Sequence, residues 1–233
     1  MVQMAVSPLP QWFEGSEYTH KVAVCVMKYG PISRITLAQI LGLSQGAVSR
    51  ITSDLIYAGV IEETPMPSGK AGKLPKGFVQ KENAERRGRP QTGLRIIENA
   101  RSFVGMKINA THISAIAVNA IGQIITGCHD LEIEDTSPQT VVALIKQLTI
   151  DCSDEAEMAG WPKPCAVGIS LGGYVVDNAV VTFAPFMHWS QPVELSAMVR
   201  EATGLPTGIY NDIDSLVVDA CLFGSGVGLD SFA

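Results

Sequence analysis

Three stretches near the start of the chain repeat apolar residues at the spacing of an amphipathic helix. Ser33 and Ser44 stand where helix caps are expected for the second and third stretches, and Gly30-Pro31, Gly42 and Gly59 follow the stretches as stops. The apolar positions are Val22, Cys25, Val26 and Tyr29 in the first stretch, Leu37, Ile40 and Leu41 in the second, and Val48, Ile51, Leu55 and Ile56 in the third. The pattern therefore predicts three short helices.

Only Gly42-Leu43-Ser44 separates the second helix from the third, and this spacing predicts a helix-turn-helix. The outward positions of the third helix are small or able to form hydrogen bonds, and the residues that we predict to contact DNA here are Ser44, Gln45, Gly46, Ser49, Arg50 and Ser53. Gln45 and Arg50 would read adenine or guanine in the major groove, and Ser49 would hold a phosphate. A three-helix bundle with a solvated polar face would show the same spacing.

A basic segment follows the three helices. Residues 60–62 and 93–97 are typical of a strand that leaves the bundle and one that returns, so the segment between them is expected to form a hairpin extension, or wing. Residues 70–95 hold eight Lys and Arg against two Glu, a net charge of +6. We predict that Arg86, Arg87 and Arg89 contact the DNA backbone or minor groove. A flexible, solvated basic loop is the alternative.

Charge divides the chain into two parts. Residues 1–102 carry 13 Lys and Arg against 8 Asp and Glu, whereas residues 103–233 carry 4 against 15, so the net charges are +5 and −11. We therefore expect two domains, a DNA-binding domain at about residues 15–100 and an acidic domain at residues 101–233. The whole chain has 46% apolar and 17% charged residues, which excludes an intrinsically disordered protein.

The sequence has no clear features of a membrane helix, a secretion signal or a metal site. No stretch has the length and hydropathy of a membrane helix, and the start does not resemble a secretion signal, so a cytoplasmic location is expected. The cysteines are scattered and odd in number: Cys25, Cys128, Cys152, Cys165 and Cys221. Buried, reduced thiols are the simplest interpretation, and no metal site is predicted.

After residue 102 the pattern changes to short segments rich in Val, Ile and Ala. Residues 103–109, 112–119 and 123–128 predict a three-stranded meander, and Ser137-Pro138 opens a helix. Strands are then expected at residues 166–170 and 207–210, and helices at residues 193–203 and 213–223. This order is typical of an α/β domain with a mixed sheet, so the whole chain combines α+β and α/β features.

Ligands in such sheets bind beyond the carboxyl ends of strands. Two places fit this rule, Gly172-Gly173 after one predicted strand and Asn211-Asp212 after another. The Asp212 carboxylate could hold a sugar hydroxyl or act as a base. It could equally be an ordinary helix cap, and the two glycines could be no more than a tight turn.

Taken in order, these features resemble the ROK family of sugar-responsive repressors and sugar kinases. The resemblance runs from about Tyr18 to the last residue and favours the regulator branch, which includes repressors that respond to N-acetylglucosamine and xylose. It is carried by residues 43–50, Gly88-Arg89-Pro90, residues 168–173, residues 184–189 and Asn211-Asp212. The resemblance implies a winged helix-turn-helix followed by an actin-like, ribonuclease-H-like domain, acting as a dimer on double-stranded DNA and responding to a sugar.

The departures from the family are informative. Family kinases hold ATP phosphates with an Asp-x-Gly-Gly-Thr turn, but here the corresponding residues run from Lys107 to Thr111 and lack the acidic residue and both glycines. Kinase activity is therefore not expected, and no catalytic residue is assigned. Phe186 replaces an asparagine that contacts the sugar in the family. It could stack on a sugar, as could Trp189, or belong to the core.

The resemblance stops where the family's second glycine-rich lobe would begin, so a partial sugar-sensing domain is expected. The family's zinc motif would lie beyond Ala233, and no cofactor is assigned. Residues Gly172, Gly173, Asn211 and Asp212 are the predicted sugar site. We predict a sugar-modulated DNA-binding regulator, most simply a repressor, of carbohydrate-use genes; a sugar kinase or a non-functional truncated regulator is the alternative.

Overall fold

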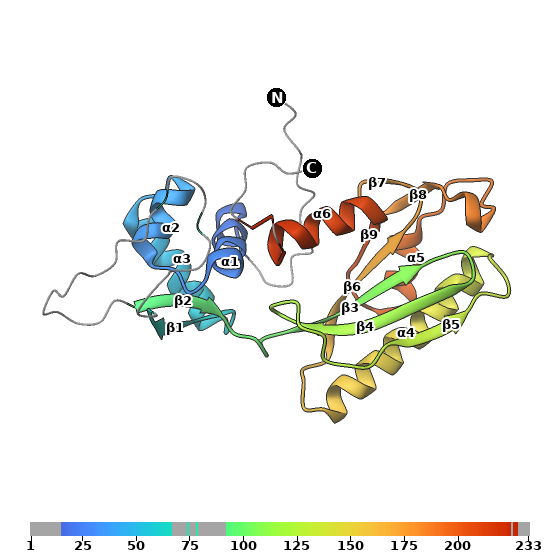
Figure 1. The fold of residues 1–233 in the computed structure, drawn as a ribbon, viewed down its shortest axis with the longest axis horizontal. Coiled ribbons are helices and arrows are strands. Elements are labelled where there is room, and N and C mark those ends of the chain that lie inside the picture. The colour runs from blue at the N-terminus through green and yellow to red at the C-terminus, as the bar shows by residue number, and fades with distance from the viewer. Residues whose placement is uncertain (1–14, 67–73, 75–77, 79–91, 225, 228–233) are drawn as a thin grey trace, which may run out of the picture. The chain divides into compact units, whose positions relative to one another are not determined.

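The computed structural model describes residues 15–66, 74, 78, 92–224 and 226–227 (Figure 1). The chain divides into two compact units, one built around residues 13–100 and the other around residues 101–216.

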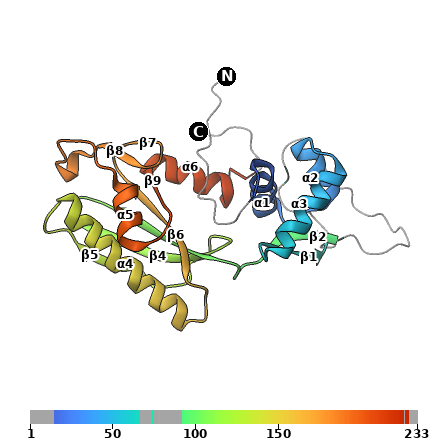
Figure 2. The ribbon, with the colours of Figure 1, turned by 180° about the vertical axis from the view of Figure 1, so that it is seen from behind.

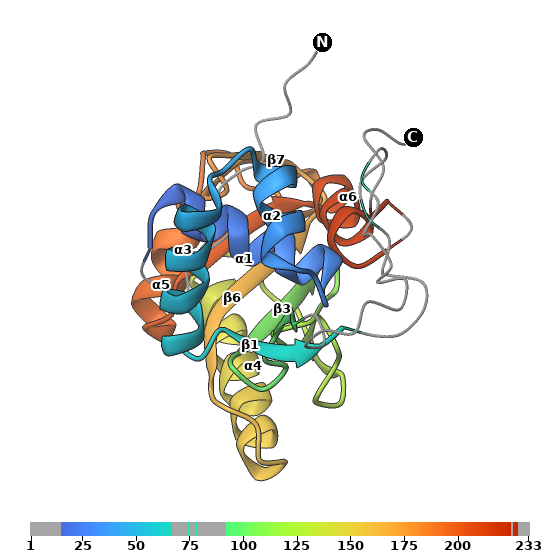
Figure 3. The ribbon, with the colours of Figure 1, turned by 90° about the vertical axis from the view of Figure 1, so that its left-hand side faces the viewer.

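The first unit begins with the three predicted helices, which pack against one another in pairs (Figure 3). Their bounds are Glu17–Tyr29 for α1, Arg34–Leu41 for α2 and Gln45–Tyr57 for α3. Ser33 and Ser44 cap α2 and α3 as predicted, because each side chain accepts a hydrogen bond from the backbone N–H three residues later. Gly42 ends α2 with a φ of 64°, a left-handed conformation that glycine adopts without strain.

The predicted apolar faces form the core of this unit. Val22, Leu37, Val48 and Leu55 are almost completely buried, whereas Ile40 is only half-buried. Two antiparallel strands follow the helices, β1 at Ile61–Pro65 and β2 at Thr92–Ile96. The predicted outgoing and returning strands are thus paired with each other.

The second unit contains a five-stranded mixed sheet, as predicted. Its order is β5-β4-β3-β6-β9, with β3, β4 and β5 antiparallel and β3, β6 and β9 parallel. The strands are β3 at Ser102–Ile108, β4 at His112–Asn119, β5 at His129–Glu132, β6 at Pro164–Leu171 and β9 at Thr207–Asn211.

Two helices cover one face of this sheet, α4 at Pro138–Met158 and α5 at Leu195–Thr203 (Figure 2). Val104, Met106 and Ile108 of β3 point into the core between α4 and the sheet. Because side chains alternate along a strand, Phe103, Gly105 and Lys107 belong to the opposite face. A hairpin that the sequence pattern did not predict, β7 at Tyr174–Val176 and β8 at Val180–Phe183, follows β6. The last helix is α6 at Asp212–Leu222.

The prediction of a strand at residues 123–128 is wrong, since the third strand of the meander is β5. The Asn119 side-chain oxygen accepts hydrogen bonds from the backbone N–H groups of Ile121 and Gln123 and turns the chain there. Ile124 then forms only an isolated bridge with Val118. The apolar pattern misled the prediction because β5 is an edge strand, and edge strands commonly carry charged side chains.

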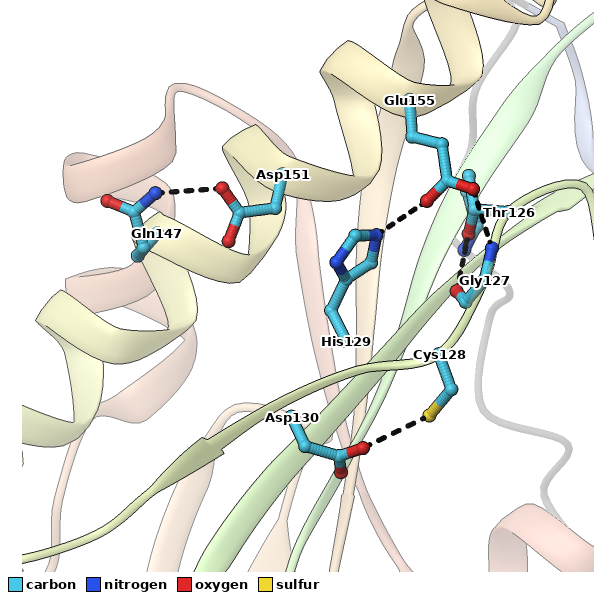
Figure 4. A network of polar contacts seen from close by, with 9 residues as sticks. Thr126, Gly127, Cys128, His129, Asp130, Gln147, Asp151 and Glu155 are labelled. Atoms are coloured by element: carbon cyan, nitrogen blue, oxygen red, sulfur yellow. Dashed lines mark hydrogen bonds and ion pairs between the residues drawn. The ribbon is translucent and has the colours of Figure 1, made fainter.

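A polar network joins β5 to α4 (Figure 4). Glu155 of α4 accepts a 2.9 Å hydrogen bond from the backbone N–H of Gly127, and its other carboxylate oxygen lies 2.7 Å from Nε2 of His129. These contacts lower the pKa of Glu155, the Gly127 hydrogen bond most and the His129 contact next. The network holds the edge strand to the helix that covers the sheet.

Helices long and apolar enough to cross a membrane are not found among the described residues. In the same part of the chain, no cluster of three or more His, Cys, Asp or Glu side chains could hold a metal ion. The five cysteines are free, but the expectation that all are buried is wrong. Cys25 and Cys152 are buried, Cys165 and Cys221 are half-buried, and Cys128 is exposed.

Candidate functional site

The first candidate site is the outward face of α3. Gln45, Gly46, Ser49, Arg50 and Ser53 are all exposed, as is the capping residue Ser44. Three residues separate the end of α2 from the start of α3, and the Leu43 N–H donates a hydrogen bond to the carbonyl of Ala38 in α2. The start of α3 is therefore exposed to solvent, and its outward side chains are uncharged or basic.

Two of these hydroxyl groups are already used within the helix. Ser44 Oγ accepts a 3.2 Å hydrogen bond from Ala47 N–H, and Ser53 Oγ donates one of 2.9 Å to the carbonyl of Ser49. By contrast, the side chains of Gln45 and Arg50 form no hydrogen bond or ion pair with other described residues. They are therefore the side chains of this face with most capacity to bind a partner.

Two further exposed side chains of α3 were missed in the sequence. Asp54 lies one turn after Arg50 and, with Tyr18, Leu43 and Arg50, lines an open groove of about 580 Å³ between α1 and α3. Tyr57 is 95% exposed at the end of the helix. The i to i+4 spacing from Arg50 could have revealed Asp54, whose negative charge would oppose a phosphate nearby.

The packing behind α3 depends on Arg34, which the sequence did not single out. Its Nε donates a 2.9 Å hydrogen bond to Thr52 of α3, and its Nη2 forms a 2.8 Å ion pair with Glu63 of β1. Arg34 thus links α2 to both α3 and β1. The three predicted wing arginines, Arg86, Arg87 and Arg89, lie outside the described residues.

The second candidate site lies where β6 and β9 end and α6 begins. Lys107 of β3 is aligned with Ser170 of β6, on the sheet face opposite to α4. Asp212, the first residue of α6, accepts a 2.6 Å hydrogen bond from Ser170 Oγ and forms an ion pair with Lys107 through the same carboxylate oxygen. The structure therefore brings together side chains from β3, β6 and α6.

The neighbouring Asn211 has a different role. Its Nδ2 donates a 2.6 Å hydrogen bond to the carbonyl of Gly173, and its Oδ1 accepts one of 2.8 Å from Ile213 N–H. Asn211 rather than Asp212 therefore satisfies a free backbone N–H at the start of α6. The alternative in which Asp212 is an ordinary helix cap is wrong.

The two glycines differ in what surrounds them. A Cβ at Gly173 would lie 2.4 Å from the carbonyl oxygen of Phe183, so the close approach of two backbones requires glycine there. A Cβ at Gly172 would lie 3.5 Å from Asp212 Oδ2 and 3.6 Å from the ring of Phe186, which are ordinary contacts. Gly172 therefore lies beside a carboxylate oxygen and an aromatic edge.

Phe186 and Trp189 can now be separated. Both rings pack against the core, but Phe186 also lies beside Gly172, whereas the indole N–H of Trp189 donates a 2.6 Å hydrogen bond to the carbonyl of Thr136. Trp189 is thus a structural residue.

Asp212 remains ionised at neutral pH. Partial burial acts to raise its pKa, but hydrogen bonds from Lys107 and Ser170 and the charge of Lys107 outweigh it, so the net effect lowers the pKa. The carboxylate is therefore a hydrogen-bond acceptor, and its Oδ2 lies beside Gly172.

The side chain of Asn109 closes the turn that follows β3. Asn109 Oδ1 accepts hydrogen bonds from the backbone N–H groups of Thr111 and His112, at 2.9 and 2.8 Å, and from the Thr111 hydroxyl. These two N–H groups are consequently not free to bind an anion.

No family model matches the chain. Among curated proteins, it is 22% identical to the DNA-binding transcriptional repressor Mlc of Escherichia coli over 204 residues, which are 85% of this chain and 45% of Mlc. It is 22% identical to the xylose repressor of Bacillus spizizenii over 203 residues, 86% of this chain and 47% of that protein. The chain thus spans about half the length of the curated relatives that it matches.

Among solved structures, the fold is similar to that of a ROK family transcriptional regulator described as a homolog of E. coli Mlc. The TM-score is 0.64 at 23% identity, covering 88% of this chain and 48% of that one. The sequence relatives and this structural neighbour agree, and they span both units. The chain is therefore similar in sequence to transcriptional repressors and similar in fold to a ROK family transcriptional regulator.

Proposed function

We propose that this protein is a DNA-binding transcriptional regulator, acting as a repressor of carbohydrate-use genes whose DNA binding is modulated by a sugar. The observation that carries the proposal is the exposed face of α3, which follows a three-residue turn from α2 and presents Gln45 and Arg50 without partners among the described residues. The names of the relatives, a transcriptional repressor and a xylose repressor, support it.

In this proposal the first unit is a winged helix-turn-helix. Helix α3 enters the major groove, where Gln45 and Arg50 contact base edges and Ser49 contacts a phosphate. The strands β1 and β2 form the base of the wing, and Arg86, Arg87 and Arg89 add contacts to the DNA backbone. Two copies of the chain bind a two-fold symmetric operator.

The second unit is the proposed sugar-binding part. Asp212 Oδ2 accepts a sugar hydroxyl above Gly172, Phe186 borders the apolar face of the sugar ring, and Asn211 fixes the Gly173 loop. A sugar that binds one arrangement of the unit better than another shifts the population and so alters DNA affinity.

We infer that the chain does not transfer phosphate. Lys107 stands where family kinases have an acidic residue, and the Asn109 side chain occupies the turn amides that would otherwise face phosphates. Asp212 is paired with Lys107 and its pKa is lowered, which makes it a poor general base.

The experiment is a selection of bound fragments from random duplex DNA by the full chain at near-physiological salt, with and without a mixture of common sugars. We expect an inverted repeat to be enriched and its enrichment to fall when one sugar is present. A folded protein that enriches no sequence would contradict the proposal.

A matched pair of variants assigns the roles. Arg50→Ala should weaken binding to the enriched duplex more than to random duplex, because a base contact discriminates by about 1–3 kcal/mol. The control variant Lys28→Ala removes one positive charge from α1. It should weaken binding to the enriched and the random duplex only slightly and by the same factor. Equal losses on the two duplexes for Arg50→Ala would show that Arg50 does not read bases.

A further inference from the structure

The ion pair between Lys107 and Asp212 sets the charge of the second candidate site. Lys107 lies on the sheet face that α4 does not cover, between Ser114 of β4 and Ser170 of β6 in the strand register. The Lys107 and Asp212 side chains are 46% and 32% exposed, so ligands can reach both.

Other positive charge is scarce in this part of the chain. Between residues 164 and 222, which form every other element of the site, the sequence has Arg200 as its one Lys or Arg, and Arg200 belongs to α5. The next charged residue of α6 is Asp214, which is exposed. The charge of Lys107 is thus balanced by Asp212 before any ligand arrives.

We propose that this site selects an uncharged, polyhydroxylated ligand and rejects its phosphorylated form, because Asp212 neutralises the charge of Lys107. The inference rests on the proposed function, in which this is a ligand site. Neighbouring hydroxyl groups donate to Asp212 Oδ2 and accept from the Lys107 ammonium, so a neutral diol satisfies both members of the pair. Lys107 therefore binds the ligand in this proposal, in addition to replacing the acidic residue of the phosphate-binding turn in family kinases.

A phosphate ester of the same ligand is expected to bind more weakly because of its charge. It carries about −1.5 to −2 charges at pH 7, and at this site it would lie against the Asp212 carboxylate. Among the described residues of the site, the cation is Lys107, which already interacts with that carboxylate. Repulsion between like charges is stronger in a partly buried site than in water.

The test compares free sugars with their phosphate esters by calorimetry on the full chain. The probes are glucose and N-acetylglucosamine against the 6-phosphate of each. For the wild type we expect at least one free sugar to bind at least about tenfold more tightly than its ester, a difference of about 1.4 kcal/mol. Asp212→Asn keeps an acceptor but removes the negative charge, and it should shift this ratio toward the ester by at least about tenfold.

A double variant identifies the source of that shift. Combining Lys107→Gln with Asp212→Asn should abolish the gain in ester binding, because the gain arises from the uncompensated Lys107 charge. Asp214→Asn and Lys146→Met remove exposed charges of the same unit and should leave the ratio unchanged. Thermal melting of each variant reports that it is folded.

The outcomes separate this inference from the proposed function. Tighter binding of the ester to the wild type, an unchanged ratio in Asp212→Asn, or no binding of any probe overturns the inference, while an enriched operator would leave the DNA-binding role intact. A ratio that shifts as expected with no enriched operator supports the ligand class and overturns the proposed regulator.

Discussion

Replacing Gly173 by alanine tests how the candidate ligand site is built. The new Cβ would lie 2.4 Å from the carbonyl oxygen of Phe183 and 3.0 Å from Leu171 Cδ1, whereas an ordinary contact is at least 3.4 Å. The backbones must therefore separate by about 1 Å, at a cost of about 1–3 kcal/mol. The shift also strains the hydrogen bond from Asn211 to the Gly173 carbonyl, which contributes about 1 kcal/mol.

Gly172→Ala is the matched control, because its Cβ would make contacts of 3.5 and 3.6 Å and no close approach. Neither glycine adopts a left-handed φ, so the two variants differ in their steric contacts and not in strain of φ. We expect the stability of Gly172→Ala to change by less than about 1 kcal/mol. The added methyl group nevertheless occupies the space beside Asp212 Oδ2 and should weaken sugar binding.

The assay is thermal and urea unfolding of both variants, with sugar titration of each. Gly173→Ala should melt at least about 4 °C below the wild type, and Gly172→Ala within about 2 °C of it. Equal stabilities for the two variants would refute the role assigned to the Gly173 backbone. Unchanged sugar affinity in Gly172→Ala would refute the location of the ligand above that glycine.

Three other changes probe the rest of the molecule. Ser44→Ala removes the cap of α3 and should lower the free energy of unfolding by about 1 kcal/mol, measured by urea denaturation. Asp54→Asn removes a negative charge near Arg50 and should tighten binding to operator and random duplex alike, measured by fluorescence anisotropy. Because the folded-state pKa of Glu155 is lowered by Gly127 and His129, its stabilising contribution is present above the ordinary value of 4.5 and lost as the pH falls through the lowered pKa. The melting temperature of Glu155→Gln should therefore lie below that of the wild type at pH 7, and the gap should narrow below pH 4.5; a constant gap would contradict this explanation.

Local signals were strong enough to predict the helices and most strands. Caps such as Ser33 and Ser44 act within three residues, and the left-handed Gly42 ends a helix by its own conformational freedom. The hairpin of β7 and β8 was missed because its strands are short, and β5 was misplaced because an edge strand follows no apolar pattern. In both cases pairing with the neighbouring strand, rather than an apolar pattern, decides the structure.

The candidate ligand site was predicted in part. The rule for strand ends located Asn211 and Asp212, since it depends only on the order of elements. The partners of Asp212 could not be predicted, because Lys107 is 105 positions away and approaches only through the alignment of β3 with β6. The cap formed by Asn211 and the proposed role of Asp212 as a ligand acceptor likewise depend on side-chain directions that sequence spacing does not determine.

The central claim is that α3 reads a DNA sequence, and the most direct test is the ratio of affinities of the full chain for its selected duplex and for a scrambled duplex. We predict that the wild type prefers the selected duplex by at least about a hundredfold and that Arg50→Ala lowers this ratio at least about fivefold. Equal affinity of the wild type for both duplexes would contradict the claim.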